Sequence, residues 1–366
     1  MRKSILTVGG LCSGVGGIEL GFKNAGFHIS WANDMDKYAM VTYESIIGKN
    51  HYIGKQAMKL ENIIPNKEYS QQLKKVDILT AGFPCQAFSI AGLRKGFADD
   101  RGNVFFEIVK VIKFLKKNRT APKVLFLENV KNFKTHDKGN TYNVVKKTLE
   151  SLNYSVYTKI INTSSITTIP QNRERTFMVC FYGEKKWAKY QLDEQNATLT
   201  DNEILELQND CPATFSYHKQ YSKFKKSHKQ NIWKILRKSH EIQDKYYYTK
   251  EKYPRAFSLL DEAVKKKNTI YQYRRVYVRE NKSNECPTLT ANMGTGGHNV
   301  PIVLVNKKRK RYRKLTPEEC FRFQGYENIN LPGNVADNQL YKQAGNSVTV
   351  PVITKLARLI KNSLEA

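Results

Sequence analysis

Cys85 is the residue of this chain best placed to act as a nucleophile. It lies in the segment Ala81 to Ile90, where glycine, proline and polar residues follow a short apolar run of β type. A cysteine is more often a small buried apolar residue, but this composition predicts an exposed loop. In an α/β fold the loop after such a strand lies at the carboxyl edge of the sheet, where ligands bind. Because the thiolate form of cysteine is a strong nucleophile, the segment points to covalent chemistry.

A carboxylate and two guanidinium groups accompany later apolar runs. Glu128 ends one such run, where a glutamate is either a general acid or a solvated strand terminus. Arg173 and Arg175 come directly before the apolar run Thr176 to Phe181. Side chains alternate along an extended segment, so the two arginines share a face. We expect a thiol, a carboxyl group and two guanidiniums to converge at one sheet edge.

A glycine-rich turn follows the first β-type run. Gly14, Gly16 and Gly17 lie between that run and a helix expected to begin near Ile18. Glycines let backbone amides approach a ligand, although many turns of this kind are glycine-rich for steric reasons alone. Asp34 follows the second β-type run, where a carboxylate can accept both hydroxyls of a ribose. This pair of features predicts a nucleoside ligand.

The charge of the chain indicates a polyanionic partner. Its 366 residues include 61 Lys and Arg against 33 Asp and Glu, a formal net charge of +28. Nucleic acid is the favoured partner, with a membrane surface or a biased composition as alternatives. No apolar stretch approaches the roughly 20 residues that cross a bilayer, so we expect a protein of the cytoplasm.

The cysteines give no sign of a metal site or a disulfide framework. All six lie far apart in the sequence, at Cys12, Cys85, Cys180, Cys211, Cys286 and Cys320. None has a second cysteine or a histidine at zinc-ligand spacing. We therefore expect no metal, and we interpret every cysteine except Cys85 as a small apolar residue.

Alternating β-type runs and helical patterns in the first half predict a doubly wound α/β fold with a parallel sheet. The expected strands are 5–8, 28–32, 77–81, 124–127 and 176–181. Apolar residues at helical spacing from Ile108 to Leu115 predict a helix that packs on this sheet. Near Glu184 the composition shifts to Lys, Tyr, Gln and Asn, and an apolar stripe in 348–359 predicts a last helix on the first domain. We expect a catalytic domain of residues 1–184 plus 341–366 and a smaller inserted domain of residues 185–340.

In this order, the segments resemble the motifs of bacterial C5-cytosine DNA methyltransferases of the HhaI type. The matching segments are Gly14 to Gly17 for the cofactor loop, Pro84 to Gln86 for the nucleophile, Glu128 to Val130 for the acid, Gln171 to Arg175 for the paired arginines, Pro287 to Ala291 and Gly345 to Val348. The resemblance covers nearly the whole chain except about residues 185–284.

The resemblance implies transfer of a methyl group from S-adenosyl-L-methionine to C5 of a cytosine that is flipped out of a short specific sequence in double-stranded DNA. It implies Cys85 as the nucleophile, with Glu128 at N3 and the exocyclic amine and Arg175 at O2. Arg173 would position the Cys85 loop and lower the pKa of its thiol. The segment Phe88 to Arg101 would close over the site.

The resemblance also implies binding residues and partners. The cofactor residues are Cys12, Gly14, Val15, Gly16, Gly17, Asp34, Met35, Pro84, Asn346 and Val348, and the DNA-contacting residues are Gln86, Ser89, Arg101 and Thr288. We expect a monomeric, bacterial or phage-encoded methylase of a restriction-modification system, with any cognate endonuclease acting separately. The inserted domain would read the recognition sequence.

The chain departs from the family in its cofactor loop. Gly10 and Cys12 stand where the family usually has Asp and Phe, and Met35 stands where it often has Trp. These departures keep open a catalytically silent DNA-binding homologue. A tRNA cytosine methyltransferase is a second alternative, because relatives of the same fold act on RNA.

The run Lys307 to Lys314 holds seven basic residues among eight. It lies between an apolar run and the helix start signal Thr316 to Glu319. It is either a solvated turn, because like charges repel and stay exposed, or a clamp for DNA phosphates.

Overall fold

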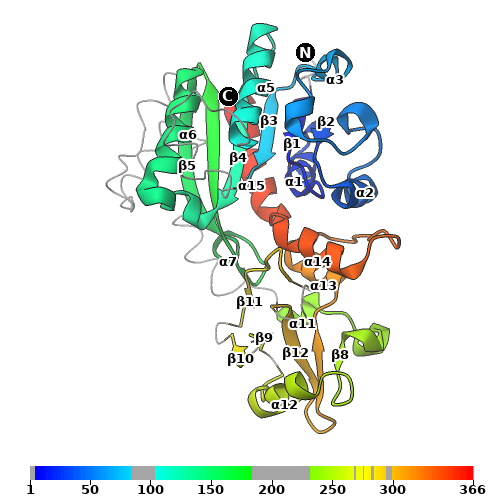
Figure 1. The fold of residues 1–366 in the computed structure, drawn as a ribbon. Helices are drawn as coiled ribbons and strands as arrows, with labels where there is room; N and C mark the ends of the chain where they lie inside the picture. Colours follow the sequence, from blue (N-terminus) through cyan, green and yellow to red (C-terminus); the bar gives the residue numbers. More distant parts are fainter. Residues whose placement is uncertain are drawn as a thin grey trace. The chain divides into compact units, whose positions relative to one another are not determined.

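The computed structural model describes residues 5–84, 104–183, 231–267, 269–274, 276–281, 284–293 and 299–365. The chain divides into two compact units, whose elements are labelled in Figure 1. The first unit comprises Met1–Ile161, Glu174–Lys219 and Ile353–Ala366, and the second comprises Asn162–Arg173 and Gln220–Val352. Within the described ranges, no helix has the length and apolar character needed to cross a membrane.

A six-stranded sheet with the order β2-β1-β3-β4-β7-β5 forms the centre of the first unit. Its strands are β1 (Thr7–Leu11), β2 (His28–Asn33), β3 (Ile78–Gly82), β4 (Val124–Val130), β5 (Tyr154–Asn162) and β7 (Glu174–Tyr182). The first four are parallel, as predicted, but β7 runs antiparallel to β4. The prediction of a wholly parallel sheet is wrong at β7, because a buried strand reads as a continuous apolar run in either direction.

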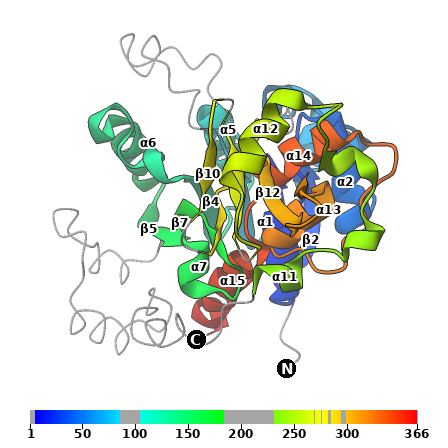
Figure 2. The same ribbon diagram turned by 90° about the horizontal axis from the view of Figure 1, so that it is seen from below.

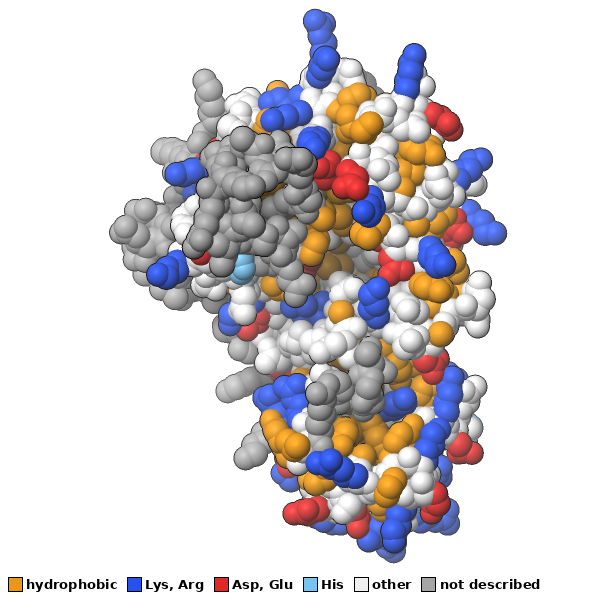
Figure 3. All heavy atoms as spheres, viewed as in Figure 1, with side chains coloured by type: hydrophobic (Ala, Val, Ile, Leu, Met, Phe, Trp, Pro, Cys, Tyr) orange, Lys and Arg blue, Asp and Glu red, His pale blue; other side chains and the backbone are white. Residues whose placement is uncertain are grey.

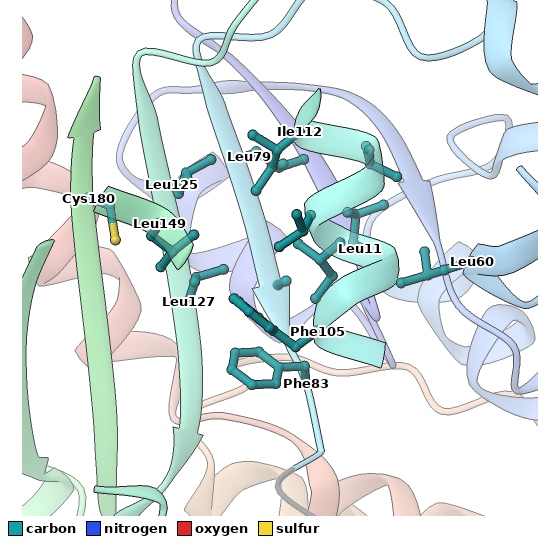
Figure 4. Packing of buried hydrophobic residues seen from close by; sticks show 14 of the residues in the cluster. Leu11, Leu60, Leu79, Phe83, Phe105, Ile112, Leu125, Leu127, Leu149 and Cys180 are labelled. Carbon is teal, nitrogen blue, oxygen red and sulfur yellow. The ribbon is translucent and has the colours of Figure 1, made fainter. Parts of the chain in front are cut away.

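Helices cover both faces of this sheet. They are α1 (Gly17–Asn24), α2 (Lys37–Ile46), α3 (Lys67–Gln71), α5 (Val104–Lys117), α6 (Asn140–Ser151) and α15 (Val350–Glu365). Leu125 and Leu127 of β4 share a buried cluster with α5 and α6 (Figure 4). Between them Phe126 points to the opposite face, where its ring centroid is 5.3 Å from that of Phe22 in α1. The doubly wound fold is therefore confirmed.

The last helix returns to the first unit, as its apolar stripe predicts. Figure 2 shows α5 and α15 on opposite sides of β4. An added Cβ on Gly21 of α1 would come within 2.4 Å of Cβ of Ile353. The two helices approach so closely that only glycine fits at this position.

The second unit contains a five-stranded antiparallel sheet with the order β10-β9-β12-β13-β8. Its strands are β8 (Tyr247–Tyr248), β9 (Tyr271–Tyr273), β10 (Val278–Glu280), β12 (Pro301–Asn306) and β13 (Arg311–Lys314). Separately, β6 (Gln171–Asn172) pairs in parallel with β11 (Cys286–Pro287). The helices are α7 (Thr163–Ile166), α11 (Ile232–Ile235), α12 (Pro254–Ala263), α13 (Pro317–Phe323) and α14 (Asp337–Asn346). Leu260 of α12 packs against Ile302 and Leu304 of β12, which gives this unit its own core.

The basic run does not form a single surface. Its residues 307–310 form the exposed turn between β12 and β13, where Lys310 pairs with Asp261 at 2.7 Å. Arg313 of β13 is 2% exposed, and its guanidinium donates two hydrogen bonds of 2.8 Å to the carboxylate of Glu319. The run is therefore part solvated turn and part strand with the buried Arg313, and its exposed residues 307–311 remain candidates for phosphate contacts.

Glu319 also completes the predicted helix start. Thr316 caps α13 by accepting from the Glu319 amide, and Glu319 Oε2 accepts from the Thr316 amide at 2.8 Å. The same carboxylate accepts from the backbone amide of Arg237 at 2.8 Å. One buried carboxylate thus joins a strand, a helix start and a more distant segment of the second unit.

We predict that Glu319→Gln lowers the free energy of unfolding by about 3–5 kcal/mol, because it leaves the buried charge of Arg313 unpaired. Urea unfolding followed by circular dichroism measures the change. The exposed pair at the same hairpin provides the control, since Lys310→Met should leave the midpoint almost unchanged. Equal midpoints for Glu319→Gln and the unaltered protein would show that the ion pair does not support the fold.

Candidate active site

The register of the central strands brings a carboxylate and a guanidinium to one edge of the sheet. Gly82 at the end of β3 pairs with Glu128, and Val130 of β4 pairs with Arg175 near the start of β7. Arg175 Nε lies 3.2 Å from Glu128 Oε1, and both side chains are largely buried. Burial lowers the pKa of Arg175, while the negative charge of Glu128 opposes that shift. Two of the four predicted catalytic groups thus form an ion pair.

Asn129 ties this edge to the segment that precedes Cys85. Its Nδ2 donates to the carbonyl oxygen of Phe83 at 2.8 Å, and its Oδ1 accepts from the Val130 amide at 2.8 Å. Phe83 is buried against the ring of Phe105, with centroids 5.6 Å apart. The sequence shows Asn129 directly after Glu128 but gives no sign of these hydrogen bonds. Cys85, Gln86, Ser89 and Arg101 lie outside the described residues, as does the predicted lid.

Arg173 makes its described hydrogen bonds elsewhere. Its guanidinium donates to the carbonyl oxygens of Leu289 at 2.8 Å, Gly345 at 3.1 Å and Ser347. All three acceptors belong to the second unit, as does Arg173, whereas Arg175 belongs to the first. The side chain is 2% exposed. Strand alternation led us to expect both guanidiniums beside Glu128. In the structure only Arg175 pairs with Glu128, and Arg173 binds the three carbonyl oxygens.

The segments that Arg173 joins are tightly packed. An added Cβ on Gly345 would lie 2.2 Å from the backbone of Thr290, so a side chain has no room there. Thr288 donates from its hydroxyl to the carbonyl oxygen of Asn172 at 2.6 Å, which holds β11 on β6. Of the two predicted cofactor residues in this region, Asn346 is exposed and Val348 is buried.

The glycine loop and Asp34 are directly connected. The Gly14 amide donates to Asp34 Oδ2 at 2.8 Å, and the Asp36 amide donates to Asp34 Oδ1 at 2.8 Å. Burial raises the pKa of Asp34, and these amide hydrogen bonds oppose the rise. Gly16 has a φ of 81°, and an added Cβ there would meet Ile47 at 2.6 Å. An added Cβ on Gly14 would meet nothing within 4 Å, so the loop has open space beside it.

Four further residues lie in or near the glycine loop and Asp34. Cys12 has a φ of 52°, a left-handed conformation unusual for a residue with a side chain. Val15 is buried, whereas Met35 is 65% exposed beside Asp34. Sequence reasoning missed Glu19, a fully buried carboxyl group next to Gly10. The only signal for it is the absence of a side chain at Gly10.

The chain is similar to known DNA methylases over nearly its whole length. The family described as C-5 cytosine-specific DNA methylase matches residues 6–362. The Type II methyltransferase M.Bsp6I of Bacillus sp. (strain RFL6) is 42% identical over 364 residues, covering 98% of this chain and 100% of the relative. The Type II methyltransferase M.HhaI of Haemophilus parahaemolyticus is 33% identical over 367 residues, covering 97% of this chain and 94% of the relative.

Solved structures show the same fold. The Dnmt2 methyltransferase of S. pombe aligns with a TM-score of 0.68 at 18% identity, covering 99% of this chain and 100% of that chain. The six-stranded α/β sheet and this likeness show the Rossmann-like fold, and the family match makes it the fold of a methyltransferase. The chain belongs to the C-5 cytosine-specific DNA methylases and is a DNA cytosine-5-methyltransferase.

We predict that Arg173→Lys destabilises the fold by about 2–3 kcal/mol, because an ammonium lacks the planar fork that reaches several carbonyls at once. Denaturant unfolding measures the loss, and hydrogen exchange at residues 286–291 and 340–350 should rise with it. Arg322→Lys, a change at a partly exposed arginine of α13, is the control. If Arg173→Lys changes neither the free energy of unfolding nor the hydrogen exchange, the three carbonyl contacts do not stabilise the fold.

Proposed function

We propose that the chain transfers a methyl group from S-adenosyl-L-methionine to C5 of a cytosine flipped out of a short specific sequence in duplex DNA. The observation that carries this proposal is the Glu128–Arg175 pair beside the end of β3. From that end the chain leads through Phe83, which Asn129 holds, to Cys85 two residues later. The names of the relatives, Type II methyltransferases, support a methylase of a restriction-modification system.

The chemistry explains why a thiol, a carboxyl group and a guanidinium are needed together. C5 of cytosine is a poor nucleophile, so the Cys85 thiolate first forms a bond to C6 and the electron pair of the C5–C6 bond moves toward C5. Glu128 contacts N3 and the exocyclic amine, and Arg175 binds O2, so that both stabilise the charge that develops on the ring. C5 would then take the methyl group as its bond to the donor sulfur breaks, leaving S-adenosylhomocysteine. Loss of the C5 proton returns the electron pair to the C5–C6 bond and breaks the S–C6 bond. The base leaves the helix because these atoms are inaccessible in a stacked duplex.

Arg173 has a different role in this proposal. Its three carbonyl contacts support a positioning role within the second unit rather than a direct effect on the thiol. We propose that it fixes the strand segment that leads into Arg175. Arg175 is then the guanidinium that touches substrate.

The described residues fit S-adenosyl-L-methionine, which supplies an electrophilic methyl group on a sulfonium. The open space at Gly14 leaves room for a ligand against the backbone. Each oxygen of Asp34 accepts one amide and keeps acceptor capacity for a ribose hydroxyl. Exposed Met35 can cover the adenine with its flexible thioether. The other proposed cofactor residues are Cys12, Val15, Gly16, Gly17, Pro84, Asn346 and Val348.

DNA binding rests on charge and on the second unit. Figure 3 shows Lys and Arg side chains spread over one face of the protein, with fewer Asp and Glu among them. In the second unit the exposed turn residues 307–310 offer phosphate contacts. We further propose that Gln86, Ser89, Arg101 and Thr288 approach the DNA, and that the enzyme acts as a monomer separately from any endonuclease.

Transfer of tritiated methyl groups from S-adenosyl-L-methionine tests the function directly. Duplex DNA should be labelled and tRNA should not, and bisulfite sequencing of genomic DNA from expressing cells should show one short methylated sequence. Labelling of tRNA alone would support the tRNA methyltransferase. Binding of DNA without labelling would support the silent homologue.

We predict that Cys85→Ser abolishes methyl transfer and leaves DNA binding largely intact, because a hydroxyl is far less acidic and a weaker nucleophile. Gel-shift and methyl-transfer assays measure the two effects. The unaltered enzyme should form a denaturation-resistant adduct with DNA that carries 5-fluorocytosine, since fluorine cannot leave as a proton does. Methylation without such an adduct would rule out covalent addition through Cys85.

We predict that Asp34→Ala weakens binding of S-adenosylhomocysteine by at least about 1 kcal/mol, because charge-assisted hydrogen bonds to the ribose are lost. Calorimetric titration measures the affinity. The Gly14 amide also loses its acceptor, so the variant should be less stable as well. Unchanged affinity would remove Asp34 from the cofactor site.

We predict that neutralising Lys308 and Arg309 weakens binding to target and non-target duplex alike, because phosphate contacts carry no sequence information. Each lost contact should reduce the slope of log affinity against log salt by roughly 0.9. Lys310 is left unchanged because it pairs with Asp261. The control neutralises Lys74 and Lys75, two exposed neighbours in the first unit. A shift in the methylated sequence would instead show that the turn reads bases.

A further inference from the structure

Glu19 is a buried carboxyl group that has no role in the proposed function. It lies in the first turn of α1 and is 1% exposed. Its Oε1 accepts from the hydroxyl of Ser13 at 2.8 Å and lies 3.5 Å from that of Thr80. In the described part of the chain, its Oε2 is buried and has no hydrogen-bond partner. A buried carboxylate oxygen without a donor is costly, so a partner from outside the chain would stabilise it.

The backbone at Gly10 leaves the space that this carboxyl group fills. An added Cβ on Gly10 would lie 1.9 Å from Glu19 Oε1 and 2.6 Å from the Ser13 hydroxyl. Any side chain at position 10 would therefore displace Glu19. Gly10 is at the end of β1 and Ser13 belongs to the glycine loop, so Glu19 puts its carboxyl group between that strand and that loop.

The electrostatic surroundings favour a cationic partner. The titratable groups that interact with Glu19 in the described ranges are Asp34, Cys12, Tyr43 and Tyr52, which are acidic or neutral. Burial raises the pKa of Glu19 to about 7, the Ser13 hydrogen bond lowers it, and the charge of Asp34 adds to the rise. A cation that donates hydrogen bonds would give Glu19 Oε2 a partner and would reduce the repulsion between the carboxylates of Glu19 and Asp34.

We propose that Glu19 binds the ammonium group at the amino-acid end of S-adenosyl-L-methionine. This inference rests on the proposed use of that cofactor and deepens it. The cofactor carries two positive groups, a sulfonium and an ammonium. Of these, only the ammonium has N–H groups that can donate a hydrogen bond to Oε2. Asp34 takes the ribose in the proposed function, so the two carboxylates would hold different parts of one ligand. Glu19 would also repel the carboxylate of that amino-acid end and thereby orient it away from Gly10.

A pair of ligands separates this role from a structural one. S-adenosylhomocysteine has the amino-acid end, and 5′-deoxy-5′-methylthioadenosine keeps the adenosine and sulfur but lacks it. Calorimetric titration of Glu19→Gln should show roughly ten- to one-hundred-fold weaker binding of S-adenosylhomocysteine, the loss of one charge-assisted hydrogen bond. Binding of the truncated ligand should stay the same. Asp34→Ala should weaken both ligands, and Glu68→Gln, an exposed first-turn glutamate of α3, should weaken neither.

The unaltered protein provides a second test that needs no variant. If Glu19 is partly protonated when free and fully ionised against an ammonium, binding of S-adenosylhomocysteine near pH 7 releases part of a proton. Affinity should then fall as the pH drops through about 7, where the free carboxyl group binds its proton. Titrations in buffers of different ionisation enthalpy measure the release, which the truncated ligand should not cause.

The outcomes are distinct. If Glu19→Gln weakens both ligands equally, or if both ligands release the same protons, Glu19 is only a structural support of the loop and the inference is wrong. If the unaltered protein binds neither ligand, the proposed cofactor itself fails. Selective loss for S-adenosylhomocysteine, with selective proton release, supports the assignment.

Discussion

The antiparallel pairing of β7 with β4 is the constraint on which the candidate site depends. The parallel strands β3 and β4 end at one edge of the sheet, and an antiparallel neighbour begins at that same edge. Arg175, near the first residue of β7, therefore meets Glu128, near the last residue of β4. A parallel β7 would carry Arg175 to the far edge, about one strand length away. The direction of a single strand thus decides whether the carboxylate and the guanidinium can form their ion pair.

A second feature of the candidate site is that two buried carboxylates hold its glycine loop. Asp34 accepts the Gly14 amide, and Glu19 accepts the Ser13 hydroxyl, so each holds part of the glycine loop. Burial disfavours both charges, as the raised pKa values of Asp34 and Glu19 show. The loop is therefore pre-organised by groups whose charge a cationic ligand would stabilise. Loop conformation and cofactor affinity should be coupled for this reason.

Much of this fold could be predicted from apolar patterning, because buried strands and amphipathic helices leave strong periodic signals. The helix from Ile108 to Leu115 and the capped start at Thr316 are confirmed. Strand direction could not be predicted, since a continuous apolar run is the same in both directions. Contacts between distant residues were also hidden: Arg173 appeared to share a face with Arg175, but it binds carbonyls more than a hundred residues away in the sequence. Glu19 could not be predicted as a site residue because its position depends on the space that Gly10 leaves, which only the structure shows.

The packing of Gly21 against Ile353 has a consequence for how the protein is made. The first unit takes its last helix from residues that follow the whole second unit in the sequence. On the ribosome, α1 and the sheet emerge early but must wait for nearly all of the chain before α15 covers that face. Domains usually fold as units during synthesis, yet here the second unit can complete its own core first. Contacts of such long sequence separation also slow folding, so nascent chains should expose the apolar face of α1 to chaperones until α15 has been synthesised.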